Sequence, residues 1–295
     1  MADLQANIRR YCEDEYTDHL VYHRLALREK DNAKKNILEQ LSKQEEDHYR
    51  FWNGLIEDHS PRIKHGVIAF VIVLRYLFGL TFVVKFLERH EEKVIDEYKA
   101  VLTSFQGKTR KYLERMIKEE EKHENYFISQ INEGVVKYLG FIVLGLADAI
   151  IEISGVHAGF LGVTSSTRMA GVAGLVVGFA AAISMGAAAY LQAKQDTTRN
   201  PLTSAFITGV SYILAVTLLA LPYFLTGDMI QAFIASLVMA LLLTAYFTFY
   251  SAILFDRSFG GEFFESAALT LGTAVATYFF GELLGRLFGI HPYGN

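Results

Sequence analysis

Two parts of the sequence repeat the same arrangement of side chains that bind metal ions. In each, a glutamate precedes a Glu-x-x-His motif by about 30 residues. The six residues are Glu15, Glu45 and His48 in the first copy and Glu91, Glu120 and His123 in the second. Residues three apart on a helix project from the same face, and four carboxylates with two imidazoles suit a pair of divalent iron or manganese ions. The pattern therefore predicts a two-metal carboxylate site inside a four-helix bundle.

A simpler interpretation is that these are ordinary acidic helices. Glutamate is frequent in soluble helices, and Glu45 and Glu120 both lie in acidic runs. A single Glu-x-x-His motif would carry little weight. Two of them, each with an upstream glutamate at nearly the same distance, are much harder to obtain by chance, so the metal site is the preferred interpretation.

The choice of ligand on the third helix stays open. The competing residues are Glu88, Glu91 and Glu92. Glu91 is preferred because Tyr98 follows it by seven residues, just as Tyr22 follows Glu15 by seven. This echo predicts a bundle with pseudo-twofold symmetry.

Four helices are expected to position these residues, in two hairpins. They are predicted at residues 3–30, 31–59, 88–105 and 108–133, with Asp31 as the N-cap of the second and a break at Gly107 before the fourth. Between the hairpins, residues 66–87 are apolar and long enough to cross a bilayer. Arg75 and Lys85 argue against a span, and a single span would separate the two hairpins. We expect this segment to lie against the bundle or the membrane surface.

The second half of the chain has a different composition. Of the 28 Lys+Arg and 32 Asp+Glu residues, most lie before residue 138. Five apolar segments follow, at about 138–162, 170–193, 202–225, 229–254 and 264–289. Each is long enough to span a bilayer, and their many Gly and Ala residues favour close helix packing in lipid. The chain is therefore predicted to be all-α, with domains at 1–134 and 135–295.

The charges of the short connections predict the orientation of the spans. Lys137, Lys194, Arg199 and Arg257 would fall on one side of the membrane, opposite Arg168. The positive-inside rule then places the N-terminal domain in the cytosol and the C-terminus outside. We expect an integral protein of the plasma membrane.

Three residues inside the spans are candidates for a transport pathway. Asp148 and Glu152 lie four apart in the first span and so share a helix face. Met185, in the second span, offers a soft thioether ligand. Ionisable groups in a span are costly and so are functional candidates, although a position at the membrane edge would also explain the carboxylates. A carboxylate that exchanges a proton for a metal ion also provides a means of coupling.

The N-terminal half resembles the rubrerythrin and ferritin-like family, in particular its erythrin branch. The resemblance covers about residues 5–133, through EDEYTDHLVYHRLA, EQLSKQEEDHYRFW, LERHEEKVIDEY and IKEEEKHENYF. It implies a ferritin-like bundle with a di-iron or similar centre on the six residues of the repeated pattern. The Cys-rich rubredoxin module of rubrerythrins proper is absent, because Cys12 is the single cysteine.

The second half resembles the vacuolar iron transporter family over about residues 138–290. The matching stretches are VLGLADAIIEISG, SMGAAAYLQAKQ, NPLTSA, ALPYF and YFFGELLGRLFGI. The resemblance implies a five-span homodimer that exports ferrous iron in exchange for protons, with Asp148 and Met185 at the family's membrane sites. Two features depart from the plant-type pattern. Ala189 replaces a glutamate, and only KQDTTRN joins spans two and three, where those members carry a cytosolic metal-binding insert.

The sequence favours a transporter over the other functional classes. Its expected cargo is Fe²⁺, with Mn²⁺ as a second candidate, and protons are the expected counter-ion. The N-terminal bundle would capture, sense or oxidise the metal. The alternative is a membrane-anchored di-iron oxidase or peroxidase, for which one span would be enough. No basic run with interleaved aromatic residues is present, so nucleic acid is not an expected partner.

Overall fold

The computed structural model describes residues 2–56, 60–130, 134–196 and 198–290, with side chains except at 2–3, 90, 92, 121–130 and 134–136. The described residues form helices and contain no strand, which confirms the all-α class. They divide into two compact units, Met1–Glu133 and Gly134–Asn295. The boundary lies one residue before the expected one.

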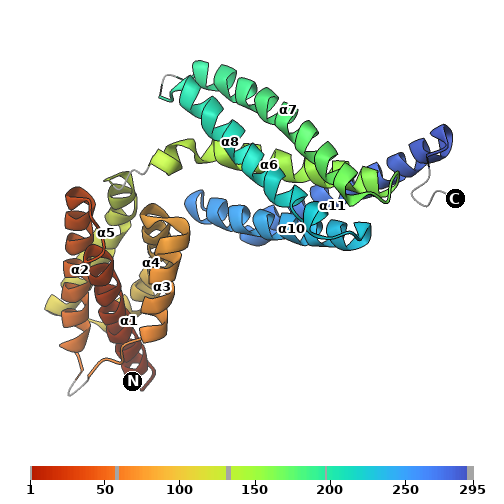
Figure 1. Ribbon diagram of the computed structural model, residues 1–295. Coiled ribbons are helices and arrows are strands. Elements are labelled where there is room, and N and C mark those ends of the chain that lie inside the picture. Colours follow the sequence, from red (N-terminus) through yellow and green to blue (C-terminus); the bar gives the residue numbers. More distant parts are fainter. Residues whose placement is uncertain (1, 57–59, 131–133, 197, 291–295) are drawn as a thin grey trace. The chain divides into compact units, whose positions relative to one another are not determined.

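Four long helices form the body of the N-terminal unit (Figure 1). They are α1 (Ala2–Ala26), α2 (Asn32–Asn53), α4 (Leu80–Val101) and α5 (Gly107–Gln130). In each hairpin consecutive helices pack together, α1 on α2 and α4 on α5, and α2 also contacts α5. The expected N-cap of α2 is confirmed, since the Asp31 side chain accepts from the backbone N–H groups of Ala33 and Lys34. Gly107 begins α5 with φ of 62°, a left-handed conformation that favours glycine.

The apolar segment between the hairpins is two helices. The first is α3 (His65–Phe78), and α4 begins at Leu80, eight residues earlier than expected. They are separated by Gly79, whose φ of 90° interrupts the helix. At 1.5 Å per residue, the 14 residues of α3 extend about 21 Å, short of a bilayer core of about 30 Å. The expectation that this segment is not a single span agrees with its structure.

The α3 helix packs on α1 and α4. Ile68, Val71 and Leu74 are buried on one face. Arg75 is held by an ion pair with Glu29, 2.9 Å from nitrogen to oxygen. Burial opposes the charge of Glu29, but backbone donors at Asp31 and Lys30 and the Arg75 guanidinium together lower its pKa. The Arg75 charge therefore anchors α3 to the connection between α1 and α2.

Five long helices make up the second unit (Figure 1). They are α6 (Gly134–Leu161), α7 (Thr167–Lys194), α8 (Pro201–Ala220), α10 (Met229–Leu254) and α11 (Phe259–Phe288). A short helix, α9 (Pro222–Leu225), continues from α8. The candidate spans are Lys137–Leu161, Thr167–Lys194, Pro201–Leu225, Met229–Leu254 and Phe259–Phe288. All five are long and apolar enough to cross a bilayer, as expected for an integral membrane protein.

Small residues allow these helices to approach closely. Gly159 of α6 faces Gly281 of α11, and a Cβ at position 281 would lie 2.2 Å from the Gly159 carbonyl oxygen. On α7, a Cβ at Gly178 would lie 2.4 Å from a methyl carbon of Val216 on α8. The buried face of α7 is almost entirely Gly and Ala. Helix contact in lipid depends on such surfaces.

We expect Gly281→Ala to destabilise the membrane unit, because its new methyl group would push against the backbone of α6. Overpacking of this kind typically costs about 1–3 kcal/mol. The matched control is Gly272→Ala on the same helix, where a Cβ meets nothing within 4 Å. Thermal unfolding in detergent, followed by gel filtration, would measure both. Equal midpoints for the two variants would contradict this close packing of α6 and α11.

Candidate metal centre

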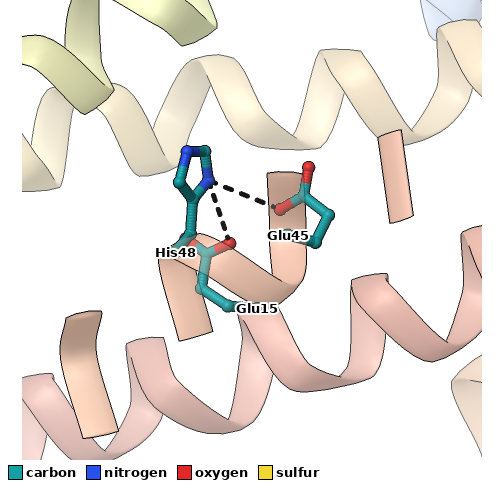
Figure 2. Close-up of side chains that lie close together, drawn as sticks. All are labelled: Glu15, Glu45 and His48. Carbon is teal, nitrogen blue, oxygen red and sulfur yellow. Dashed lines mark ion pairs between the residues drawn. The ribbon is translucent and has the colours of Figure 1, made fainter. Parts of the chain in front are cut away.

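Two carboxylates and an imidazole meet in the interior of the N-terminal unit. Glu15 comes from α1, and Glu45 and His48 come from one face of α2. Nδ1 of His48 lies 3.6 Å from Oε2 of Glu15 and 3.7 Å from Oε2 of Glu45, and Figure 2 shows both carboxylates directed at this nitrogen. One ligand atom from each residue lies within 4.8 Å of the others, and all three residues are buried. This group could hold a metal ion.

The second hairpin reaches the same place. Glu120 of α5 lies 2.9 Å from Nδ1 of His48, measured to Oε1. Glu91 of α4 lines a small pocket together with Glu15, Glu45 and Glu120. Five of the six predicted ligands are therefore neighbours. The sixth prediction, His123, falls on α5 outside the described side chains, so its ligand role stays a prediction.

The pocket also bears on the choice of ligand from α4. Among the competing residues, Glu91 lines the pocket and Glu88 is buried one turn before it without being a lining residue. The side chain of Glu92 lies outside the described set. The pocket has a volume of about 20 Å³, close to that of one water-sized sphere. Its size and oxygen-rich walls fit a compact divalent cation.

Two tyrosines connect the hairpins across the site. The Tyr98 hydroxyl of α4 donates to Oε1 of Glu15 on α1. In the reverse sense, the Tyr22 hydroxyl of α1 donates to Oε1 of Glu91 on α4, at 3.5 Å. Each tyrosine thus donates a hydrogen bond to the glutamate of the other hairpin. The two equal Glu–Tyr spacings in the sequence therefore correspond to two reciprocal contacts in the structure.

Burial and mutual repulsion control the charges of the site. Burial, with the charges of Glu15 and Glu120, raises the pKa of Glu45 well above its usual value, although His48 opposes this. Burial, with Glu88 and Glu45, raises the pKa of Glu91 in the same way. These groups therefore hold protons that a metal ion would displace.

The imidazole and one glutamate respond differently. Burial disfavours the charged form of His48, but hydrogen bonds with Glu120, Glu15 and Glu45 outweigh it and raise its pKa well above the usual value. Burial likewise opposes the charge of Glu15, yet His48, Glu45 and Tyr98 together lower its pKa. In the metal-free site, the imidazolium thus acts as the counter-ion of the carboxylate group.

Asp18 is a pocket residue that the sequence pattern did not single out. It lies on the pocket wall beside Glu15, three residues away on the same helix. Burial, reinforced by Glu15 and Asp14, raises its pKa well above the usual value. The only signal available in the sequence was this spacing of three, which places Asp18 on the face of α1 that carries Glu15.

The three candidate pathway residues lie in the second unit. Asp148 and Glu152 are half-buried near the middle of the span Lys137–Leu161, which disfavours a place at the membrane edge. The Tyr212 hydroxyl of α8 donates to Oε2 of Glu152. Met185 of α7 packs against the core cluster that contains Tyr212. The structure therefore joins α6 and α8 through the Tyr212–Glu152 contact, and Met185 lies on α7 against the same core cluster as Tyr212.

Comparison with models of known protein families found no match, and no curated protein matches the sequence.

We expect the metal-free N-terminal unit to lose stability as the pH rises. The pKa values of Glu45, Glu91 and His48 are higher in the folded than in the unfolded chain, so folding binds protons. This contribution is fully present below the unfolded pKa values of about 4.3 for Glu and 6.5 for His, and is lost as the pH passes the folded values. Each unit of difference corresponds to about 1.4 kcal/mol. The lowered pKa of Glu15 has the opposite effect on the pH dependence of stability, but it concerns one group against three.

Fluorescence of Trp52 measures this change, because it is the only tryptophan and is fully buried in the N-terminal unit. The melting temperature of the metal-free protein should be lower at pH 8 than at pH 5.5. Added Mn²⁺ should flatten or reverse the slope, since the metal replaces the protons. A melting temperature that rises with pH without metal would contradict these electrostatics.

We expect Tyr98→Phe to destabilise the same unit. The Tyr98 hydroxyl donates to Glu15 and accepts from the Trp52 indole N–H at 3.1 Å, so its removal leaves two buried polar groups without this partner. The expected cost is about 1–3 kcal/mol. Tyr112→Phe is the control, since the Tyr112 hydroxyl makes only a 3.5 Å contact at the surface. Urea titration followed by Trp52 fluorescence would compare them, and equal stabilities would show that the Tyr98 contact has no structural role.

Proposed function

We propose that this chain is a membrane transporter that exports divalent iron, with manganese as a second candidate cargo, from the cytosol in exchange for protons. One observation carries the proposal. The same polypeptide has a buried carboxylate–imidazole cluster, Glu15–Glu45–His48, and a carboxylate pair in the middle of an apolar span, Asp148 and Glu152. An anchor alone needs neither five spans nor carboxylates inside one of them.

The N-terminal unit acts in this proposal as a ferritin-like bundle of the rubrerythrin and erythrin kind. Glu15, Glu45, His48, Glu91 and Glu120, with His123, would hold a di-iron centre. The donor set supports this, because oxygen and imidazole ligands suit iron and manganese. When bound, such a centre supplies reversible one-electron chemistry. The residues themselves exchange protons for metal, orient the ligands through the two tyrosine contacts, and exclude water from the pocket.

The membrane unit provides the route of the cargo. Asp148 and Glu152 lie on one face of α6, and Tyr212 orients Glu152 from α8. Met185 adds a thioether from α7. Together they offer hard and soft ligands, enough to replace part of the water around a divalent ion without retaining it permanently. A carboxylate that releases a proton when metal binds, and takes one up when metal leaves, couples the two fluxes.

The loop charges and the family resemblance support a proposed placement in the cell. We place the N-terminal unit in the cytosol and the protein in the plasma membrane, as a homodimer. Lys194, Arg199 and Arg257 lie in or beside the connections that end on the side where α6 begins, given alternating spans. A cytosolic bundle would collect, sense or oxidise iron before it enters the membrane.

The proposal is tested by metal uptake into sealed proteoliposomes that contain a metal-sensitive dye and a pH dye. Wild type should move Fe²⁺ or Mn²⁺ with opposing proton flux. Asp148→Asn should lower the rate at least about tenfold, which corresponds to about 1.4 kcal/mol in the barrier. A Glu45→Ala/Glu120→Ala variant should only weaken the flux, because the bundle is a collector.

The matched control is Asp228→Asn. Asp228 caps α10 through the backbone N–H of Gln231, and asparagine caps a helix equally well, so flux should be unchanged. Transport that survives in Asp148→Asn would show that the route is wrong. If nothing moves and the protein instead turns over oxygen or peroxide through Glu45 and Glu120, the chain is the alternative, a membrane-anchored di-iron oxidase or peroxidase.

A further inference from the structure

A second polar region lies inside the membrane unit, between α6, α10 and α11. It is a pocket of about 70 Å³, large enough for several water molecules. Its polar walls are Thr244, Thr248 and Ser251 on α10 and Glu262, Ser266 and Thr270 on α11. We call it the hydroxyl pocket. On each helix the three residues recur every three or four positions and so share one face.

The hydroxyls of this pocket are arranged to receive water. Thr244, Thr248 and Thr270 donate to the carbonyl groups of Ala240, Thr244 and Ser266. Because their protons are used within their own helices, their oxygen lone pairs remain available as acceptors. A pocket with this lining favours water over lipid chains.

The α6 wall of the pocket leads to a buried histidine. The wall includes Ile150 and Ile151. One turn further along α6 is Ser154, which is buried and whose Oγ has no hydrogen-bond partner among the described residues. His157 follows three residues later and is completely buried, at 0% exposure. Each step is about one helical turn, a rise of about 5 Å along the helix axis, so the α6 wall of the pocket, Ser154 and His157 follow one another on one face of the helix.

The environment of His157 leaves it incompletely satisfied. Its Nδ1 lies 3.4 Å from Oγ of Ser236 on α10, a long contact. Its Nε2 has no hydrogen-bond partner among the described residues, and neither has the hydroxyl of Tyr223 on α9, whose ring centroid lies 4.1 Å from the imidazole. Gly174 of α7 completes the surroundings, and a Cβ there would lie 2.4 Å from Nε2.

Two polar atoms without described partners, on His157 and Tyr223, therefore belong to rings in contact, and a third, on Ser154, lies about one helical turn away along α6. Buried polar groups without a hydrogen-bond partner are rare in folded proteins and destabilise them, so each of these indicates a bound water, an ion or a functional role. The elements packed against His157 present Gly174, Tyr223 and Ser236, and of these only Tyr223 is titratable. Among the described residues, no ion pair involves the imidazole.

The polar region is separate from the proposed metal route. Nine residues separate Asp148 from His157, which is two and a half turns of an α-helix, so the two side chains leave α6 on opposite faces. Asp148 and Glu152 share the side that meets Tyr212 of α8. Ser154 and His157 lie on the side that faces α10 and the hydroxyl pocket.

We propose that α6 divides two routes through the membrane unit and that the second carries protons, from the hydroxyl pocket through Ser154 to His157. This rests on the proposed function, because it supplies the path of the counter-ion. A proton that arrives from water on one ring nitrogen of His157 is balanced by the release of the proton on the other. The imidazole returns to its starting state after its tautomer reverses, and no bond to carbon forms or breaks.

The test uses the full chain in proteoliposomes with Mn²⁺, which resists oxidation by air, and with internal metal and pH dyes. His157→Gln replaces the imidazole by a polar amide of similar size, which cannot take up a proton at one atom and release another. Thr248→Val and Ser154→Ala remove hydroxyls from the route. The matched control is Thr217→Val on α8, an exposed position whose hydroxyl donates to the Ile213 carbonyl.

His157→Gln should abolish the proton counter-flux and make metal movement insensitive to an imposed pH gradient, while equilibrium Mn²⁺ binding stays as in wild type. Thr248→Val and Ser154→Ala should slow proton flux several-fold, and Thr217→Val should not. Wild-type proton coupling in both His157→Gln and Thr248→Val would overturn the relay and leave the transporter standing. A wild-type protein that moves no metal would defeat both proposals.

A second measurement does not require transport or a folded His157 variant. Exchange of the imidazole C2 hydrogen for deuterium, followed by mass spectrometry, measures the access of water to each histidine. His157 should exchange measurably in wild type despite its burial, and more slowly when Thr248→Leu fills the hydroxyl pocket. No exchange in wild type, or exchange that Thr248→Leu leaves unchanged, would overturn the relay.

Discussion

Crowding of negative charge in a space that excludes water is the constraint on which the N-terminal unit depends. Glu15, Glu45 and Glu120 surround the imidazole of His48, and Glu91 stands on the same pocket wall. Bare carboxylates in such a place would repel one another and lose their hydration. The chain meets this cost with retained protons and one imidazolium, both of which a divalent cation can replace.

The surrounding fold follows from that constraint. Tyr22 and Tyr98 cross between the hairpins to hold Glu91 and Glu15, so neither hairpin can shift without disturbing the acidic group of the other. Trp52 then supports Tyr98 from behind. The crossover helix α3 keeps the hairpins adjacent, since it packs on both α1 and α4. The bundle is thus held together at its most electrostatically costly point.

The membrane unit solves the opposite problem, which is to place a few polar groups in an apolar medium. Glycine contacts such as Gly159 with Gly281 bring helix backbones together. Inside α6 the polar side chains lie on two opposite faces, Asp148 and Glu152 on one and Ser154 and His157 on the other. If the two proposed routes operate, this separation lets metal and proton pass without competing for the same ligands.

Much of this arrangement is predictable from sequence because it rests on local periodicity. The Glu-x-x-His repeats, the cap at Asp31 and the five apolar segments need only helical spacing and length. The break at Gly79 escapes such a prediction because the immediate neighbours on both sides are apolar and a single glycine is tolerated in many helices.

Contacts between helices lie beyond the sequence pattern. The exchange of tyrosine partners depends on how two helices are rotated against each other, and so does the ring contact between His157 and Tyr223. Hydroxyl residues on α10 and α11 resemble ordinary polar positions until the two helices are seen to share a pocket. Spacing along the sequence predicts which face of a helix a residue occupies, but not which residues of other helices that face contacts.

The metal centre is tested most simply by the equilibrium binding of Mn²⁺ or Fe²⁺ to the purified full chain without oxygen. Calorimetry in two buffers of different ionisation enthalpy gives the stoichiometry and the number of protons released. We predict saturable binding at the bundle with net proton release, lost in Glu45→Gln and His48→Gln and retained in Glu39→Gln, which changes an exposed residue of α2. Binding that ignores Glu45 and His48, or that releases no protons, would contradict the claim that this buried cluster is a metal centre.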